Sequence, residues 1–100
     1  MLHHVVLFRL TETIDDARQA ELMAAFAALS TRIPDIIQLH VRRDILPPDS
    51  RRPVSSHYGL IGQFADLAAL KRYQQHPDHV AALDQLRPYI EQMLVLDYEL

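Results

Sequence analysis

The chain has 100 residues, the length of one compact domain, and 49% of them are hydrophobic while 23% are charged. This balance is typical of a globular protein and excludes an intrinsically disordered chain. The absence of cysteine excludes disulfide scaffolds, cysteine–zinc sites and thiol nucleophiles. A net charge of −3 does not provide the broad basic surface of a nucleic-acid-binding protein, so we expect no nucleic-acid partner.

No apolar run approaches the roughly 18 residues needed to cross a bilayer, and the chain does not open on a signal-peptide pattern. We therefore expect a cytoplasmic protein without membrane contacts, in which residues 1–100 form a single domain.

The first predicted strand covers residues 2–10, with His4 and Phe8 on one face and His3 on the other. A helix is expected from Asp15 to about residue 32, because apolar side chains recur there at helical spacing. Thr13 and Asp16 have the spacing of a helix-capping pair, which predicts the start of this helix. Its apolar stripe contains these residues: Leu22, Met23, Phe26, Leu29 and Ile33.

Residues 36–45 alternate as a second strand, and residues 57–64 form a third. Residues 46–56 between them contain three prolines and are expected to form an exposed, mobile loop. The third strand contains Gly59 and Gly62, which indicates a bulge or the close approach of a bulky group.

Asp66 is expected to cap a second helix that directs Leu67, Leu70 and either Tyr73 or Gln74 inward. Pro77 disfavours helical geometry at the preceding residue and suits the first position of a new helix, which is expected to extend to about residue 86. Residues 92–100 form the last predicted strand.

The predicted order β-α-β-β-α-β indicates an α+β, ferredoxin-like fold with a four-stranded antiparallel sheet and helices on one face. The uncovered face is nevertheless expected to be apolar, and the side chains assigned to it are Val5, Leu7, Ile37, Leu39, Val41, Ile61, Met93 and Val95. Such a surface is unfavourable on a small monomer. The sequence therefore predicts a homodimer that packs sheet against sheet.

Six histidines are the unusual feature of the composition, because histidine exchanges protons near neutral pH. His4 lies on the helix-facing side of the first strand, and His79 lies early in the third helix. One interpretation brings them together as an acid–base pair between helices and sheet, with Asp97 and either Tyr73 or Tyr98 as partners.

Structural roles fit the same residues. His4 suits a hydrogen-bonded core position, and His76 suits a helix cap. A metal site made of His3, His40 and His57 is chemically conceivable, but no close spacing such as H-x-x-x-H supports it, so we expect no metal. The phosphate-binding, dinucleotide-binding and serine-hydrolase motifs do not occur, and we expect no cofactor.

Four segments resemble the stress-responsive A/B barrel domain (Dabb) family over nearly the whole chain. They are H-H-V-V-L-F-R-L at the start, Ile33-Pro34, Y-x-x-H-P-x-H-V from Tyr73 to Val80, and D-Y-E from Asp97. The resemblance implies a ferredoxin-like subunit in a dimeric α+β barrel. Some members are linked to stress tolerance, and one branch is similar to plant polyketide cyclases.

In that branch, the matching histidines serve acid–base catalysis of a cofactor-free aldol condensation, which implies catalytic roles for His4 and His79 and a pocket position for Tyr73. Phe26 and Met23 occupy the first-helix region where the cyclases have a polar tyrosine, and this departure weakens the case for their substrate. We expect a ligand to contact Tyr73, Phe26, Met23 and Phe8.

Two hypotheses follow: a dimer that binds a small apolar molecule without turnover, and a cofactor-free lyase or cyclase acting on a polyketide-like carbonyl compound.

Overall fold

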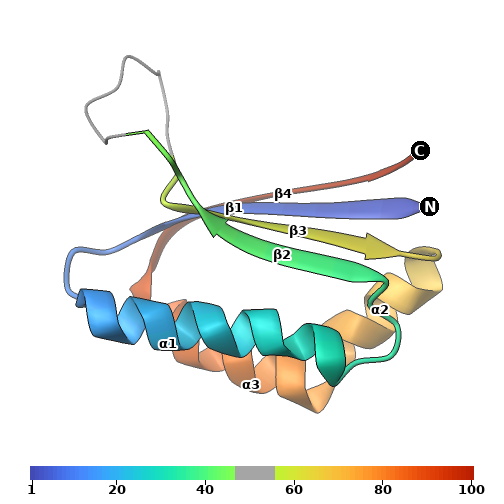
Figure 1. Cartoon of the computed structure of the whole chain (residues 1–100), viewed down its shortest axis with the longest axis horizontal. Helices are drawn as coiled ribbons and strands as arrows, with labels where there is room; N and C mark the ends of the chain where they lie inside the picture. The colour runs from blue at the N-terminus through green and yellow to red at the C-terminus, as the bar shows by residue number, and fades with distance from the viewer. Residues whose placement is uncertain (47–55) are drawn as a thin grey trace.

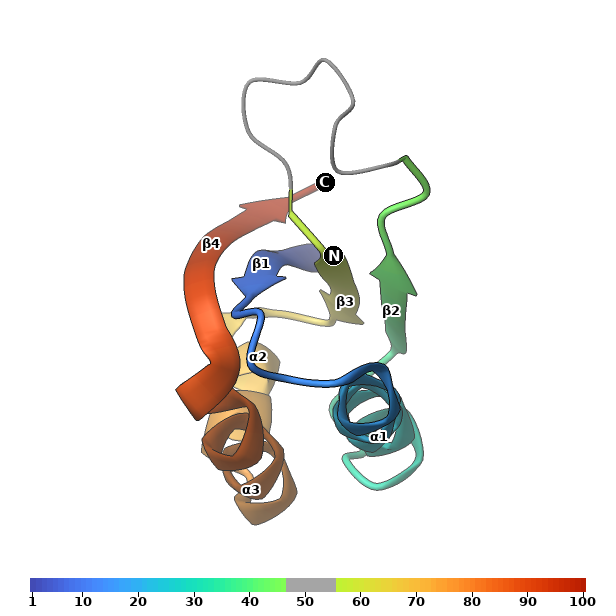
Figure 2. The same cartoon turned by 90° about the vertical axis from the view of Figure 1, so that its left-hand side faces the viewer.

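The computed structural model describes residues 1–46 and 56–100 as a four-stranded antiparallel sheet with helices against one face (Figures 1 and 2). The strand order is β2-β3-β1-β4. The elements are β1 (Leu2–Leu10), α1 (Asp16–Ala27), the 3₁₀ helix η1 (Ala28–Thr31), β2 (Gln38–Arg43), β3 (Tyr58–Phe64), α2 (Leu67–Gln75), α3 (Pro77–Leu86), the 3₁₀ helix η2 (Arg87–Tyr89) and β4 (Ile90–Glu99). This architecture confirms the predicted ferredoxin-like fold. The expected loop at 46–56 lies almost entirely outside the described residues.

The start of α1 differs from the prediction by its capping residue. The carboxylate of Asp15 accepts a hydrogen bond from the backbone N–H of Arg18 at 2.7 Å, so Asp15 is the N-cap. Thr13 instead shares a hydrogen bond of 2.8 Å with the hydroxyl of Thr11. The prediction of a Thr13 cap is therefore wrong, because the carboxylate two residues later satisfies the first turn of the helix.

The predicted cap of α2 and the break before α3 are confirmed. The carboxylate of Asp66 accepts from the backbone N–H of Ala69 at 2.9 Å. His76 has an extended backbone (φ −63°, ψ 135°), as expected for a residue before proline, and α3 begins at Pro77. Leu70 and Tyr73 on α2 are buried as predicted, whereas Leu67 is 51% exposed.

The helix-covered face of the sheet carries the core, and cross-strand register decides which side chains belong to it. His4 lies beside Asp97 of β4, and Val6 lies beside Val95. Because paired residues share a face, Met93 and Val95 lie on the covered face and not on the open one. The same reasoning assigns Leu39 and Val41 of β2 to the covered face, where they pack against the core.

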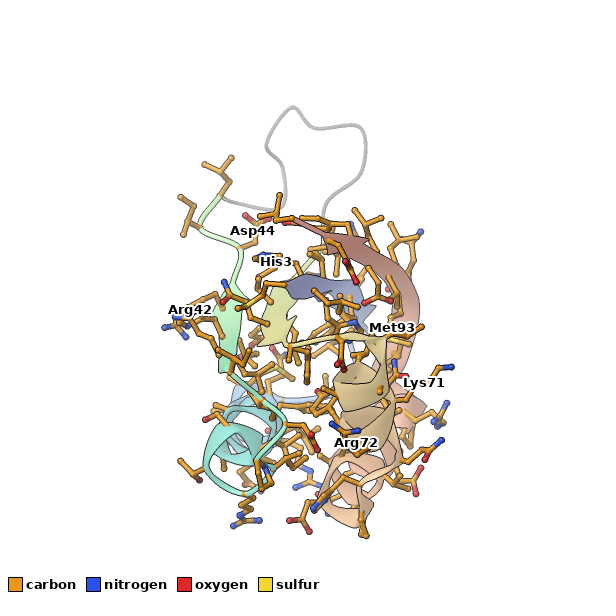
Figure 3. The ribbon with its side chains drawn as sticks, turned by 90° about the vertical axis from the view of Figure 1, so that its right-hand side faces the viewer. His3, Arg42, Asp44, Lys71, Arg72 and Met93 are labelled. Carbon is orange, nitrogen blue, oxygen red and sulfur yellow. The ribbon has the colours of Figure 1, made fainter. Side chains whose placement is uncertain are left out.

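The opposite side, here called the open face, is nevertheless apolar. Its central side chains alternate along the strands with those of the covered face. They are Val5, Leu7, Ile61, Leu94, Leu96 and Tyr98. Leu96, Leu94 and Tyr98 are 60%, 52% and 41% exposed. The expectation of an apolar open face is thus met by β1, β3 and β4, although the apolar residues of β4 are not those predicted. On this face β2 carries the polar residues Gln38, His40 and Arg42. His3 lies on this side, away from the helices (Figure 3), and its ring stacks on Tyr98 with centroids 5.1 Å apart.

The two glycines of β3 do not mark a bulge, because β3 pairs with β1 in continuous register. The register shift in the sheet falls between Arg9 and Leu10, where β1 meets β4. Gly62 does mark a close approach, since a Cβ atom there would lie 3.0 Å from the ring of Phe64 and 3.3 Å from Leu39. In the part of the chain that the structure describes, no helix has the length and apolar character of a membrane span.

Candidate functional site

A cavity of about 130 Å³ lies between the covered face of the sheet and the helices. Cavities of roughly this size, about 150 Å³, admit a molecule as large as benzene. Most of the wall is apolar and is formed by Val6, Phe8, Phe26, Leu60, Leu83, Leu86, Met93 and Val95. The polar lining side chains are His4, Tyr73, Gln74 and His79. The cavity therefore suits a small apolar molecule with a limited number of polar groups.

His4 is held by Asp97 from the neighbouring strand. The two residues are register partners, and His4 Nδ1 lies 2.5 Å from Asp97 Oδ1. An ionised carboxylate only accepts hydrogen bonds, so Nδ1 carries the proton that is shared with Asp97. His4 is only 5% exposed, and its ring meets the rings of Phe64 and Tyr73 edge-on at centroid distances of 6.3 Å and 6.2 Å. Its Nε2 is the nitrogen left for other contacts.

Tyr73 occupies the centre of this polar group. It is 1% exposed, and its ring centroid lies 4.5 Å from that of His79 and 6.2 Å from that of His4. Burial raises the pKa of the Tyr73 hydroxyl, because the phenolate would be poorly solvated there. The hydroxyl is thus protonated at neutral pH and can donate a hydrogen bond.

His79, near the start of α3, completes the group. Its ring is 6.3 Å from that of Phe26, and its Nδ1 lies 3.0 Å from the carbonyl oxygen of Gln74. Burial lowers the pKa of His79; the bond to Gln74 raises it, while His4 and His76 lower it further. The net lowering favours a neutral imidazole at pH 7, which is the form that accepts protons.

The structure brings five of the six predicted site residues to the cavity: His4, His79, Tyr73, Phe26 and Phe8. Met23 is buried in the core but does not line the cavity, so its predicted contact with a ligand is not supported. It lies one helical turn before Phe26, which takes the position at the wall.

The structure decides between the partners predicted for His4, and it also shows where the histidines of the conceivable metal site lie. Asp97 is the partner of His4, whereas Tyr98 lies on the open face against His3. The histidines of the conceivable metal site do not meet, and no group of three potential metal ligands occurs among residues 1–46 and 56–100. His57 Nδ1 accepts from the backbone N–H of Leu10 at 3.0 Å, a structural role.

Sequence reasoning missed the part of the wall formed by Met93 and Val95. Met93 lies on the helix side of β4 (Figure 3). The sequence predicts that side chains alternate along β4, but only the cross-strand register with β1 shows which of the two sets faces the helices.

Known proteins share this architecture. The family model described as the stress responsive A/B barrel domain, Dabb, matches residues 2–100. An uncharacterized protein of Streptomyces coelicolor, SCO4036, is 32% identical over 101 residues, with 99% of each chain covered.

Solved structures agree with this match. A Dabb family protein with a ferredoxin-like fold from Mesorhizobium loti is 29% identical, with 99% of this chain and 95% of that chain covered and a TM-score of 0.81. A dimeric protein of unknown function from Bacteroides fragilis is 28% identical with the same coverage and a TM-score of 0.80. A hydroxynitrile lyase from Passiflora edulis covers 97% of this chain and 90% of its own at 18% identity, with a TM-score of 0.86, a likeness of fold alone.

The family model covers nearly the whole chain, and the Streptomyces coelicolor relative is 32% identical over nearly the full length of both chains. The chain belongs to the stress-responsive A/B barrel domain (Dabb) family.

Proposed function

We propose that this protein binds a small, largely apolar molecule in the cavity between its sheet and its helices. The observation that carries the proposal is the composition of the wall, which is apolar except for a few polar side chains grouped around Tyr73. Ligand sites typically combine a mainly apolar lining with a few polar groups that fix orientation. A cavity of about 130 Å³ favours a ligand built on a single ring.

Titration of the ¹⁵N-labelled protein with toluene and with acetophenone tests this proposal. We expect both compounds to shift the signals of residues that line the cavity, and acetophenone to shift the His79 ring signals as well. Val95→Phe fills the cavity from β4 and should abolish both effects. Leu67→Phe places the same ring on an exposed position of α2 and should change neither. Shifts scattered over the surface, or unaffected by Val95→Phe, would contradict the proposal.

The same proposal includes a homodimer whose subunits meet through their open faces. Supporting it, five apolar side chains of this face are 39–60% exposed in the single chain, namely Leu7, Ile61, Leu94, Leu96 and Tyr98. A contiguous apolar patch of this kind marks an interaction surface, and two-fold self-association is the simplest way to cover it. The Bacteroides fragilis relative is dimeric. Sedimentation at micromolar concentration should give twice the mass of one chain, and a well-folded single subunit would contradict the dimer.

The cytoplasmic location expected from the sequence belongs to this proposal too. Fractionation of the cells that produce the protein checks it, and recovery in the membrane or extracellular fraction would contradict it.

A second candidate function, cofactor-free acid–base chemistry on a carbonyl compound, is favoured by one observation. A carboxylate-paired histidine, a protonated tyrosine and a histidine of lowered pKa line one cavity. In this mechanism His79 removes a proton from the carbon next to the carbonyl, and the electron pair of the C–H bond moves toward the carbonyl oxygen to form an enolate. A hydrogen bond from the Tyr73 hydroxyl would stabilise that oxygen.

Acetophenone in D₂O separates binding from chemistry. Proton removal by His79 should accelerate exchange of the methyl hydrogens for deuterium, which NMR measures directly. His79→Gln should reduce the acceleration by about 10²-fold or more, as expected for loss of a general base. A rate equal to that of buffer alone, with binding intact, would exclude acid–base turnover of this carbonyl compound and leave the binding function standing.

A further inference from the structure

The break between α2 and α3 leaves one backbone carbonyl without its usual helical partner. In a continuous helix the carbonyl of Gln74 would accept from the backbone N–H four residues later, which belongs to Asp78. Here that N–H donates to His76 Nδ1 at 3.1 Å, because His76 is the N-cap of α3. Pro77 has no N–H and holds His76 in an extended conformation. The break therefore frees the Gln74 carbonyl.

The imidazole of His79 takes the place of the missing backbone donor. Its Nδ1 lies 3.0 Å from the Gln74 oxygen. A carbonyl oxygen can only accept a hydrogen bond, so Nδ1 must carry a hydrogen. A neutral imidazole has one N–H, and burial favours the neutral form of this ring. The lone pair of His79 is consequently on Nε2, the nitrogen left for a molecule in the cavity that the ring lines.

We propose that His76 and Pro77 are positioning residues that set the tautomer of His79. By separating α2 from α3 they expose the Gln74 carbonyl, and this carbonyl fixes both the orientation of the His79 ring and the nitrogen that bears its proton. Nε2 is then a hydrogen-bond acceptor toward the cavity. A bound molecule that forms a hydrogen bond with Nε2 must offer it an O–H, an N–H or an acidic C–H group.

The proposed tautomer of His79 adds detail to the proposed function, on which its role in ligand selection rests. The tautomer itself can be tested independently of that function. For binding, it makes the His79 side of the cavity selective for hydrogen-bond donors. For the second candidate function, it leaves on Nε2 the lone pair that a proton acceptor requires. The tautomer itself belongs to the free protein, so it can be measured whether or not the cavity binds any compound.

Nitrogen NMR of the histidine rings tests the proposal at about pH 8, above the ordinary histidine pKa of about 6.5. In the free protein we expect His79 Nδ1 to resonate as a protonated nitrogen and Nε2 as an unprotonated one. The double variant His76→Ala/Pro77→Ala removes the cap and supplies an N–H and a helix-favouring residue. A continuous helix should return the Gln74 carbonyl to Asp78, and a large share of the His79 protons should move to Nε2.

The matched control is His76→Ser, which keeps Pro77 and supplies another side chain suited to the N-cap. We expect it to retain the Nδ1–H tautomer, since Ser can bind the Asp78 N–H in place of the imidazole. Backbone NMR spectra confirm that each variant is folded outside residues 74–80. If the double variant does not fold, the unaltered protein still decides the matter, because an Nε2–H tautomer there would overturn the proposal. A folded double variant that keeps the Nδ1–H tautomer would overturn it as well.

Binding of benzyl alcohol and ethylbenzene gives a second readout, since these probes have similar size and only the alcohol donates a hydrogen bond. We expect the ratio of their affinities to favour the alcohol in the unaltered protein and in His76→Ser, and to fall in the folded double variant. An unchanged ratio alongside a changed tautomer would overturn the proposed role in ligand selection. Failure of both probes to bind would count against the proposed function and leave the tautomer result intact.

Discussion

Two consecutive histidines of β1 show how differently the two faces of the sheet are used. His4, on the covered face, is 5% exposed and bonded to Asp97. His3, on the open face, stacks on Tyr98, the residue next to Asp97 on the same strand. One step along two paired strands thus separates a part-buried polar pair beside a cavity from an aromatic pair on the open face.

Both faces of the sheet are apolar, but for different reasons. The covered face packs against the helices except along β4, where Met93 and Val95 line the cavity and are 42% and 53% exposed. A polar group buried on this face, such as His4, must find a partner within the chain. Among the residues that the structure describes, no element covers the open face, and its leucines Leu7, Leu94 and Leu96 are 40%, 52% and 60% exposed. Function is thus expected from the polar groups of one face, and association from the apolar groups of the other.

Leu96→Asp is expected to have the largest effect, because it places a carboxylate at the centre of the proposed dimer interface. Each dimer would bury two unpaired charges, at a cost of several kcal/mol per charge. Sedimentation at micromolar concentration should therefore give a single subunit. Leu67→Asp is the matched control on α2, where the leucine is 51% exposed compared with 60% for Leu96. A dimer that survives Leu96→Asp would disprove association through the open face.

Asp97→Ala should have the next largest effect, since it leaves the buried His4 N–H without its acceptor. An unsatisfied buried donor costs about 1–3 kcal/mol, and about 1 kcal/mol lowers the melting temperature of a domain of this size by roughly 4–8 °C. Asp97→Asn retains an acceptor oxygen and should cost less. Glu99→Ala changes an exposed carboxylate on the same strand and should leave the melting temperature within about 2 °C, a shift of roughly 0.5 kcal/mol or less.

Equal melting temperatures for Asp97→Ala and Glu99→Ala would show that the His4–Asp97 pair contributes nothing to folding. The His4–Asp97 hydrogen bond would then serve to orient the His4 ring at the cavity and not to stabilise the fold.

Substitutions of the two glycines of β3 compare the packing of the two faces, and their expected effects on stability are smaller. Gly62→Ala adds a methyl group on the covered face, 3.0 Å from Phe64 and 3.3 Å from Leu39, and this crowding should cost about 1–3 kcal/mol. Gly59→Ala adds the same group on the open face, 3.5 Å from Leu7, which is an ordinary contact distance. Its effect should lie within about 0.5 kcal/mol. Denaturant unfolding measures both, and a larger loss for Gly59→Ala would show that the open face is the more tightly packed.

The smallest and most gradual effect concerns pH. Burial is the leading cause that lowers the pKa of both His57 and His79 below the ordinary value of 6.5. Between each lowered pKa and 6.5 the unfolded chain binds more protons than the folded one, so stability is full above pH 6.5 and falls as the pH decreases below it. Melting temperatures across this range should flatten in His57→Gln and in His79→Gln, and further in the double variant. An unchanged slope in all three would contradict the lowered pKa values.

The fold could be predicted from local signals because each has a direct physical cause. Asp66 caps a helix, Pro77 ends one helix and begins the next, and alternation defines the strands. The faces of β2 and β4 could not be assigned in the same way. Alternation gives two sets of side chains without saying which faces inward, and here both sets are apolar, so hydrophobicity did not distinguish Val95 from Leu94 or Leu96.

The sequence predicts the site residues that belong to a recognisable motif, which are His4, Tyr73 and His79. The assignment of Asp97 to His4 depended on the register between β1 and β4, and the sequence left it open among several residues. The sequence predicts that Met23 contacts a ligand, but Met23 does not line the cavity, because helical spacing defines a broad apolar stripe without showing which of its members meets an empty space. The proton on His79 Nδ1 depends on a carbonyl freed by the helix break, which only the folded backbone reveals.

The position of β1 between β3 and β4 has a consequence for how the protein is made. His4 and Asp97 are separated by 93 residues, and one wall of the cavity comes from the strand that follows every other described element. During synthesis, which proceeds from the N-terminus, the first strand can pair with β3 while its other edge stays open. Contacts between such distant residues form slowly, because a long loop must close before they are gained. A nascent chain that ends before β4 thus has no complete cavity, and the proposed ligand would stabilise only molecules in which β4 has paired with β1.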